Sequence, residues 1–343
     1  MLCVFGTIGY GLLTGKGQED QTIQEDTESQ IVHKVSTDGT YAIIVKSDGN
    51  LYNEREAEGF QQVIEEAGGE CRICVPRRNT PEAQIELISE CIKQEVDAIA
   101  IAANSQDKLQ KALRQAMKLG IRVVSLDSAV NPDSRELFIN QTRTDVVGRT
   151  LMASVLDIAG EGEWAILSST AQATNQNAWI ASIQTVMLEE EYKDLELVDI
   201  VYGMDEYDTS AEETRRLLKE HPNLKVICAP TTAGICAAAE VIREEGADVK
   251  ITGLGLPSEM ADYIGRECPY MFLWNPIEIG QLAAYASVGL VNEEIQGEEG
   301  EVLDAGALGT YRIYPSMDGG TEIILGPLFE FNEENIKEWR EIY

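Results

Sequence analysis

The sequence predicts an α/β protein with two Rossmann-like lobes, each built on a parallel sheet, joined by a multi-strand hinge. Two observations support this fold class. The chain has 343 residues, 44% of them hydrophobic, which suffices for two cores of average size. From Thr40 onward, short apolar runs alternate with longer segments of helical period, which is the pattern of repeated βα units.

The first half of this pattern predicts four strands separated by helices. The apolar runs are nearly continuous in Val, Ile, Leu and Ala, as expected for parallel strands that are buried on both faces. The predicted strands are residues 41–46, 71–76, 98–103 and 122–127, and the helices lie near 54–67, 81–94 and 106–119.

The second half repeats the arrangement, which favours two lobes of similar construction. Five further apolar runs predict strands, with helical stretches between them. These strands are residues 164–169, 197–203, 225–230, 249–256 and 270–274.

The tail predicts a return to the first lobe, because it is too short to bury a core of its own. Residues 276–295 form a long apolar helix, and we expect the chain to re-enter the second lobe at Asp304 and to end in a helix after Asn332, a residue suited to N-capping. The predicted units are residues 1–39 (an apolar signal-like or anchor-like segment with an acidic linker), 40–140 plus 276–303 (first lobe), and 141–275 plus 304–343 (second lobe).

The amino-terminal segment favours export. It is apolar over its first 13 residues, "MLCVFGTIGYGLL", and an acidic stretch follows. No Lys or Arg precedes the apolar run and no small-x-small cleavage site is clear. The segment is therefore as consistent with a retained membrane tether as with a cleaved signal peptide. We therefore expect an extracytoplasmic protein, held in the cell envelope by this segment if it is retained.

Charge and residue counts exclude several function classes. The 59 acidic and 27 basic residues give a formal charge of −32, which disfavours nucleic acid and anionic membrane surfaces. Seven cysteines imply no disulfide framework, and Cys71 and Cys74 lack the further ligands of a tetrahedral metal site. With only His33 and His221, a histidine-based triad is disfavoured. We expect no metal, no cofactor and a monomeric protein.

Polar side chains cluster directly after the predicted strands, where open α/β sheets bind ligands. The loop "SSTAQATNQNAWI", residues 168–180, adds amides that both donate and accept hydrogen bonds beside an indole ring. Two sheets with facing crevices would enclose one cleft. The strand-end residues are Lys46, Ser47, Asn50, Asn104, Asp127, Asn140, Asn175, Gln176, Thr231, Thr232, Trp274 and Asn275.

The chain from about Tyr41 onward resembles the substrate-binding proteins of sugar ABC transporters, in the ribose-binding class with the type I periplasmic binding protein fold. It is most similar to the rhamnose-binding and autoinducer-2-binding members. The stretches that carry the resemblance are "IVKSDGN", "DAIAIAAN", "VVSLDS", "ATNQNAW", "CAPTTAG", "TGLGLPSEM", "FLWNP" and "DAGALG".

The resemblance implies a site of defined residues and a defined partner, an ABC permease. It implies polar contacts from both lobes and apolar walls from three aromatic rings. Asn175 replaces an acidic residue and Thr232 an alanine of the autoinducer-2 pattern, which favours the rhamnose-binding members. The resemblance implies contacts from Lys46, Tyr52, Asp127, Asn175, Gln176, Trp179, Pro230 through its carbonyl, Thr232 and Trp274. To these we add Asn50, Asn53, Asn104, Asn140, Asn275 and Asp304 as further expected ligand-binding residues.

These residue types suit a neutral monosaccharide. Carboxylates and amides orient adjacent hydroxyls through charge-assisted hydrogen bonds, and aromatic rings cover the C–H face or the methyl group of a 6-deoxy sugar. We expect Asp127 to be the main acceptor and Lys46 to balance its charge. Each residue also has a plainer role open to it: Trp179 and Trp274 as core packing, Asn104 and Asn140 as turn formers or caps, and Lys46 as a solvated charge.

Four other functions compete with sugar import. An enzyme is disfavoured because "TGLGLPSEM" lacks the third glycine of a dinucleotide fingerprint and no P-loop lysine or GxSxG elbow is present. A transcription regulator would need a basic helix-turn-helix ahead of the lobes. An autoinducer-2 receptor and a sugar sensor for a membrane signalling kinase would need the same cleft and hinge, so both stay open as alternatives.

Overall fold

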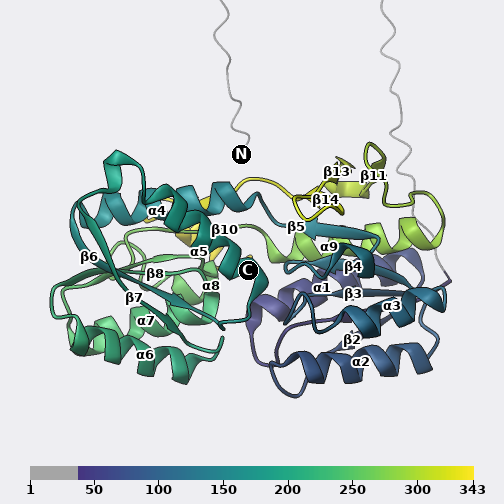
Figure 1. The fold of residues 1–343 in the computed structure, drawn as a ribbon, viewed down its shortest axis with the longest axis horizontal. Coiled ribbons are helices and arrows are strands. Elements are labelled where there is room, and N and C mark those ends of the chain that lie inside the picture. Colours follow the sequence, from purple (N-terminus) through teal and green to yellow (C-terminus); the bar gives the residue numbers. More distant parts are fainter. Residues whose placement is uncertain (1–37) are drawn as a thin grey trace, which may run out of the picture. The chain divides into compact units, whose positions relative to one another are not determined.

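The computed structural model describes residues 38–343, which fall within one compact unit. The predicted signal-like segment, with Cys3 and His33, lies outside the described residues. Among the described residues, no helix is both long and apolar enough to cross a membrane. Two separate sheets, each flanked by helices, divide this part of the chain into a first and a second lobe (Figure 1).

The first lobe contains a seven-stranded sheet in the order β13-β14-β5-β4-β3-β1-β2. All its neighbouring strands run parallel except β13, which is antiparallel to β14. Its first elements are β1 (Thr40–Ile44), α1 (Leu51–Ala67), β2 (Glu70–Cys74), α2 (Pro81–Lys93), β3 (Ala98–Ile101), α3 (Gln110–Lys118), β4 (Arg122–Leu126), a 3₁₀ turn (Pro132–Ser134) and β5 (Leu137–Asn140).

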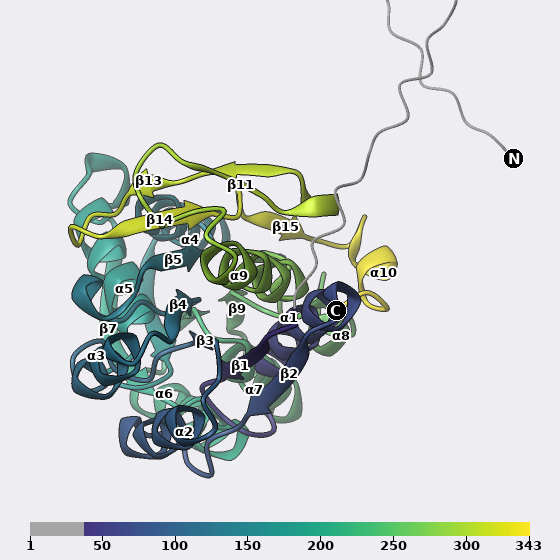
Figure 2. The ribbon, with the colours of Figure 1, turned by 90° about the vertical axis from the view of Figure 1, so that its right-hand side faces the viewer.

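The apolar runs are continuous because this sheet is covered on both faces. In β1, Tyr41 and Ile43 belong to the core under α1 and α9, whereas Ala42 and Ile44 belong to the core under α2 and α3. Figure 2 shows the two helix layers on opposite sides of these strands. Successive side chains of a strand point to opposite faces, so a strand buried on both faces needs an apolar residue at every position.

The second lobe contains a four-stranded parallel sheet in the order β7-β6-β8-β9. Helices α4 and α5 cover one face and α6 and α7 the other (Figure 1). Its elements are α4 (Thr144–Ala159), β6 (Gly162–Ser168), α5 (Thr174–Val186), a 3₁₀ turn (Glu190–Tyr192), β7 (Leu195–Tyr202), α6 (Tyr207–Glu220), β8 (Leu224–Ala229), α7 (Thr232–Glu245), β9 (Lys250–Gly253), α8 (Pro257–Met260) and β10 (Met271–Leu273).

Helix α9 (Pro276–Val291) returns the chain to the first lobe, where it packs against α1, β3 and β4. Asn275 caps it, since its Oδ1 accepts the Ile277 N–H at 3.0 Å. The remaining elements are β11 (Val302–Asp304), a 3₁₀ turn (Gly306–Leu308), β12 (Thr310–Arg312), β13 (Tyr314–Pro315), β14 (Thr321–Ile324), β15 (Phe329–Phe331) and α10 (Ile336–Trp339).

The predicted return to the second lobe at Asp304 is wrong. Strand β14 pairs in parallel with β5, and the Thr321 hydroxyl donates to the Glu136 carbonyl at 3.1 Å, so this segment stays with the first sheet. The chain re-enters the second lobe only at β15, which pairs with β10. The lobes are therefore joined by three crossings: after β5, between β10 and α9, and between β14 and β15.

Two further elements differ from the sequence prediction. The strand expected at residues 270–274 is β10, which pairs antiparallel with β15 and meets the second sheet only through a parallel bridge between Leu254 and Phe272. The terminal helix is reduced to α10. Asn332 caps the turn that leads into it, as expected, because its Oδ1 accepts the Glu334 N–H and its carbonyl accepts the Ile336 N–H, both at 3.0 Å. Phe329, Phe331 and Trp339 pack together there, with ring centroids 4.9–5.7 Å apart, so aromatic packing orders this end of the chain.

Close packing of α1 on α9 depends on glycines, which gives a testable prediction. A Cβ at Gly280 would lie 1.9 Å from the Glu56 carbonyl oxygen. We expect Gly280→Ala to lower the free energy of unfolding by about 1–3 kcal/mol, because the two backbones must move apart. Urea denaturation measures this loss.

Gly289 on the same helix is the matched control, since its added Cβ would meet only flexible side chains at 3.3 Å. Gly289→Ala should leave the unfolding free energy unchanged or raise it slightly through better helix propensity. Equal effects of the two substitutions would contradict this account of the α1–α9 contact.

Candidate functional site

A cavity lies between the carboxyl ends of the two sheets, with about 390 Å³ of empty space, open solvent at its mouth included. Both lobes and the crossing after β10 contribute to its wall, as expected for paired open α/β sheets. The lining residues are Lys46, Asn50, Tyr52, Asn53, Asp127, Asn175, Gln176, Trp179, Asp205, Pro230, Thr231, Thr232, Leu254, Leu273 and Trp274.

The Asp127 carboxylate is the centre of the polar contacts in this cavity. It pairs with the Lys46 ammonium and accepts a 2.7 Å hydrogen bond from the amide of Gln141, the first residue of the crossing after β5. The Asn175 amide reaches both carboxylate oxygens from the second lobe at 3.3–3.4 Å. Asp127 therefore links the first lobe, the hinge and the second lobe.

Asp127 also has an unusual backbone. Its φ is +56°, in the left-handed region that costs a non-glycine residue roughly 1–3 kcal/mol. Only 4% of the residue is exposed. The conformation turns the chain sharply after β4, which places the carboxylate at the strand end instead of in the sheet. A buried charge held in a strained turn is typical of functional sites.

Lys46 is held by a second layer of amides between the ends of β1 and β3. The Asn104 amide donates to the Lys46 carbonyl at 3.0 Å. The fully buried Gln84 donates to the carbonyls of Val45 and Ala102 at 3.1 and 2.7 Å, and its oxygen accepts the Asn104 N–H at 2.8 Å. These bonds fix the strand ends from which Lys46 extends.

Three aromatic rings form the apolar part of the wall. The Trp179 and Trp274 rings lie 5.7 Å apart at 54°, and each residue is 4% exposed. The Trp274 indole N–H donates to the Tyr52 hydroxyl at 2.6 Å, and that hydroxyl lies 3.4 Å from Asp127. Burial and the nearby Glu56 and Asp127 carboxyls raise the pKa of Tyr52 well above its usual value, so it stays a neutral phenol.

The start of α5 brings two amides to the cavity. The Gln176 oxygen accepts hydrogen bonds from the Ser168 hydroxyl at 2.7 Å and the Ser169 N–H at 2.8 Å. These two buried donors at the end of β6 therefore have an acceptor. The Asn175 oxygen accepts the Gln176 N–H at 2.9 Å, leaving the Asn175 amide group free to extend toward Asp127. Gln176 thus shapes the loop as well as lining the cavity.

Asp205 is a cavity residue that the sequence analysis missed. It follows β7 with φ of +60°, accepts the Thr231 hydroxyl at 2.5 Å and lies 3.4 Å from the Asn50 amide of the first lobe. Burial raises the pKa of Asp205, with Asp127 adding to the effect and Thr231 and Lys46 opposing it. The same strand-end pattern, applied to "GMDEYD", could have identified it.

Four predicted site residues do not line this cavity. Asn104 lines a smaller neighbouring cavity and supports Lys46. Asn140 donates to Glu322 at 2.9 Å because β14 covers the side of β5. Asn275 is used as the cap of α9, and Asp304 is an exposed residue whose carboxylate accepts the Gly306 N–H at 3.0 Å. The other eleven predicted residues do line the cavity.

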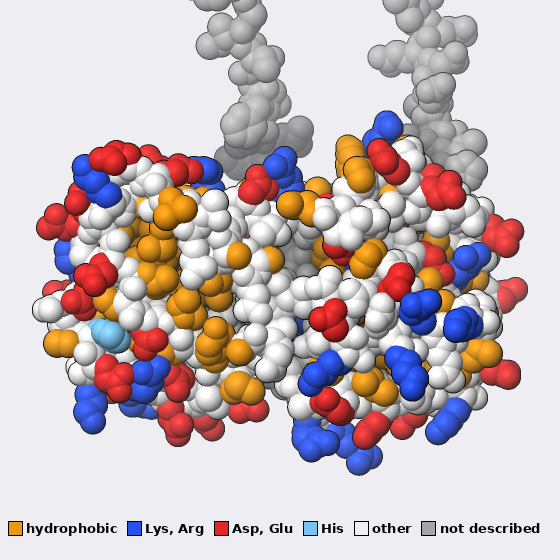
Figure 3. Space-filling view, in the orientation of Figure 1, with side chains coloured by type: hydrophobic (Ala, Val, Ile, Leu, Met, Phe, Trp, Pro, Cys, Tyr) orange, Lys and Arg blue, Asp and Glu red, His pale blue; other side chains and the backbone are white. Residues whose placement is uncertain are grey.

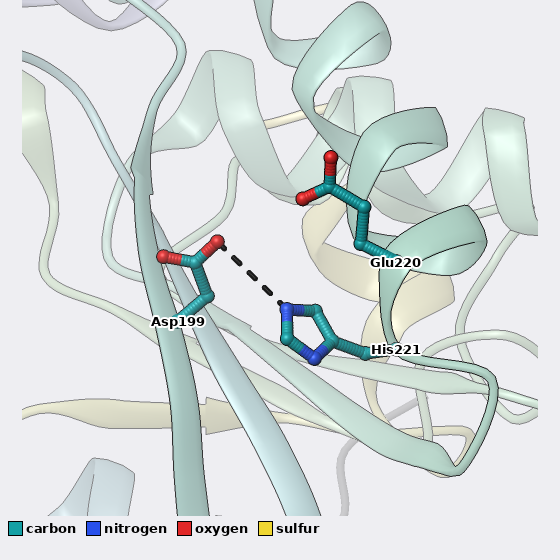
Figure 4. A group of neighbouring side chains, drawn as sticks. All are labelled: Asp199, Glu220 and His221. Atoms are coloured by element: carbon teal, nitrogen blue, oxygen red, sulfur yellow. Dashed lines mark ion pairs between the residues drawn. The ribbon is translucent and has the colours of Figure 1, made fainter.

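Two groups outside the cavity have side chains that could in principle hold metal. Asp199, Glu220 and His221 lie together in the second lobe, with His221 3.9 Å from Asp199 (Figure 4). Arg216 already neutralises both carboxylates at 3.2 and 2.6 Å. Cys71 and Cys74 are free thiols, and the Cys74 sulfur lies 4.0 Å from that of Cys91.

The fold and cleft define a two-lobed binding protein, and comparison with known proteins agrees. Residues 41–295 match the periplasmic binding protein domain, so the chain belongs to this family. The predicted sugar-transporter binding-protein class and its type I fold are confirmed. The family consists of extracytoplasmic binding proteins, not enzymes.

Two solved structures of related binding proteins resemble this chain. A solved ABC transporter solute-binding protein from Clostridium phytofermentas with bound L-rhamnose is 52% identical, with a TM-score of 0.88 over 90% of this chain and 100% of that chain. LsrB from Clostridium saccharobutylicum in complex with AI-2 has a TM-score of 0.82 over 88% of this chain and 99% of that chain, at 19% identity, which shows the fold alone.

A third relative is the D-ribose/D-allose-binding protein of Pseudomonas aeruginosa strain PAO1, which is 25% identical over 224 residues. The match spans 62% of this chain and 66% of that protein, just under two thirds of its length. The chain is therefore a sugar ABC transporter solute-binding protein by family.

The support that Gln176 gives to its loop is testable by substitution. We expect Gln176→Ala to lower the free energy of unfolding by about 1–3 kcal/mol, because the buried Ser168 hydroxyl and Ser169 N–H lose their acceptor. Chemical denaturation measures it. Gln184, exposed on the same helix, is the control, and its alanine variant should stay within about 0.5 kcal/mol of the wild type. A Gln176→Ala variant as stable as the control would argue against the role.

Proposed function

We propose that this protein binds a neutral monosaccharide, L-rhamnose or a close 6-deoxyhexose, in the cavity between its lobes and delivers it to a membrane permease. The observation that carries the proposal is the Asp127 carboxylate, paired with Lys46 at the centre of a cavity walled by amides and indole rings. Such a carboxylate accepts hydrogen bonds from two adjacent hydroxyls, each worth roughly 1.5–3 kcal/mol.

The charges of the lining residues support an uncharged ligand. Lys46 is the one cation among them, and Asp127 and Asp205 are both carboxyl residues. With the ammonium already paired, a phosphate or a carboxylic acid would meet uncompensated negative charge. A polyhydroxylated ligand would instead donate hydrogen bonds to the carboxylates and accept them from Lys46 and Asn175.

The aromatic wall supports a sugar with an apolar edge. Trp179, Trp274 and Tyr52 form one side of the cavity, and Leu254 and Leu273 add aliphatic surface. A C–H face or the methyl group of a 6-deoxyhexose packs favourably against such rings. The L-rhamnose held by the relative that is 52% identical supports the same choice.

Delivery would follow from closure of the lobes around the sugar. Both lobes contribute polar groups to the cavity, so a ligand that contacts both stabilises the closed arrangement. The closed surface would then be recognised by the permease. On the face in Figure 3, Lys and Arg side chains are scattered among Asp and Glu, which gives no support to a nucleic-acid partner. We propose that the protein acts as a monomer.

Binding of L-rhamnose to the purified protein tests the proposal. We expect a rise in melting temperature and measurable binding by calorimetry. Asp127→Asn should weaken binding by about a hundredfold or more, since the charge-assisted bonds to the sugar are lost. Asp248→Asn, an exposed substitution in the same lobe as Asp205, should bind like the wild type.

Related ligands sharpen the test. L-Mannose differs from L-rhamnose only by a hydroxyl on C6, so weaker binding of L-mannose would locate the methyl group against the indoles. Stronger stabilisation by autoinducer-2 would favour the signal receptor over the rhamnose importer. Unchanged rhamnose affinity in Asp127→Asn would remove the site assignment.

We further propose that the apolar residues 1–13 tether the protein at the outer face of the cytoplasmic membrane. Membrane fractionation of the native protein should recover it with the envelope, and removal of residues 1–37 should release it. A pool found only in the cytosol would contradict the proposal.

A further inference from the structure

Glu56 is a fully buried carboxyl directly behind the cavity. It lies on α1 four residues after Tyr52, so the two side chains share one face of the helix, and it has no exposed surface. Neither of its carboxyl oxygens has a hydrogen-bond partner among the described residues. An ionised carboxylate in such a place is far more costly than a neutral acid.

The charge balance of the cavity gives Glu56 no cation of its own. Lys46 is the one lysine or arginine among the lining residues, and its ammonium pairs with Asp127. Asp205 is a second carboxyl: burial raises its pKa, and the charge of Lys46 opposes that rise. An ionised Glu56 would therefore be a third carboxylate around a single ammonium.

The groups that act on Glu56 are all within or behind the site. Burial raises the pKa of Glu56 well above its usual value, the Asp127 charge raises it further, and the Lys46 charge opposes them. Of the neighbouring elements, α9 packs the backbone of Gly280 against the backbone of Glu56. The charge of Glu278, on the same helix, raises the pKa of Tyr311 and Tyr343. On β2, Glu70 and Arg72 pair with each other.

We propose that Glu56 is a positioning residue that keeps its proton in the sugar-binding state, and that ionisation of Glu56 weakens sugar binding. The inference rests on the proposed function of the cavity. A neutral Glu56 leaves the Lys46 ammonium paired with the Asp127 carboxylate, which accepts hydrogen bonds from hydroxyls. An ionised Glu56 repels Asp127 and competes for the ammonium. The reaction is one proton leaving the Glu56 carboxyl for solvent.

The first test needs no ligand. Between the pKa of Glu56 in the unfolded chain and its raised pKa in the folded protein, the native state holds more protons, so the wild type loses stability as pH rises. Glu56→Gln has no proton to lose, so its melting temperature should fall less than that of the wild type between about pH 6 and pH 9. Glu58→Gln, exposed on the same helix, should follow the wild type.

Comparison between variants removes the effect of other titrating groups. Burial and the charge of Glu54 raise the pKa of Glu259 to about 7, and Glu259 titrates alike in every variant. Parallel pH profiles of Glu56→Gln and the wild type would overturn the proposal, as would a Glu56→Gln variant that loses stability more steeply with pH. If Glu56→Gln does not fold, Glu56→Met supplies an uncharged side chain of similar length.

The second test measures L-rhamnose affinity across the same pH range. Affinity of the wild type should fall several-fold toward alkaline pH, and affinity of Glu56→Gln should stay near the acidic-pH value of the wild type. Equal pH dependence in both proteins would overturn the role of Glu56 in binding. If no variant binds a sugar at any pH, the proposed function fails, and the ligand-free melting profiles alone decide whether Glu56 keeps its proton.

Discussion

The Lys46–Asp127 ion pair is the interaction on which the rest of the site depends. It joins the ends of β1 and β4 at the floor of the cavity, with both side chains nearly buried. The pair persists in this setting because further bonds satisfy the carboxylate: Gln141 from the hinge and Asn175 from the second lobe. Removing one partner would leave a buried charge uncompensated, so the two residues have to be considered together.

The lobes meet at the cavity through polar groups, which suits a cleft that opens and closes. Asn50 lies 3.4 Å from Asp205, Asn79 lies 3.4 Å from the Met204 carbonyl, and Asn175 bridges to Asp127 at 3.3 Å. Bonds of this length contribute little net free energy, because water replaces them when they break. A ligand in contact with both walls can therefore shift the balance between open and closed arrangements.

Electrostatics and packing act together on the choice of ligand. The carboxyl residues outnumber the cation among the lining residues, and three aromatic rings line the same cavity. Glu56 extends this arrangement behind the cavity, since a neutral acid there adds no charge to the site. Glu56 lies on α1, whose backbone approaches α9 closely at Gly280, and the Glu56 side chain has no exposed surface.

The sequence by itself determined the fold class and most of the cavity. Continuous apolar runs identify strands buried on both faces, and the carboxyl ends of parallel strands in one sheet share an edge, so the strand-end pattern alone places Lys46 and Asp127 together. Only the tertiary structure decided the pairing of β14 with β5, the use of Asn140 and Asp304 outside the cavity, and the burial of Glu56. Those outcomes depend on contacts between residues far apart in the chain, and local pattern carries no information about which distant segment covers a given side chain.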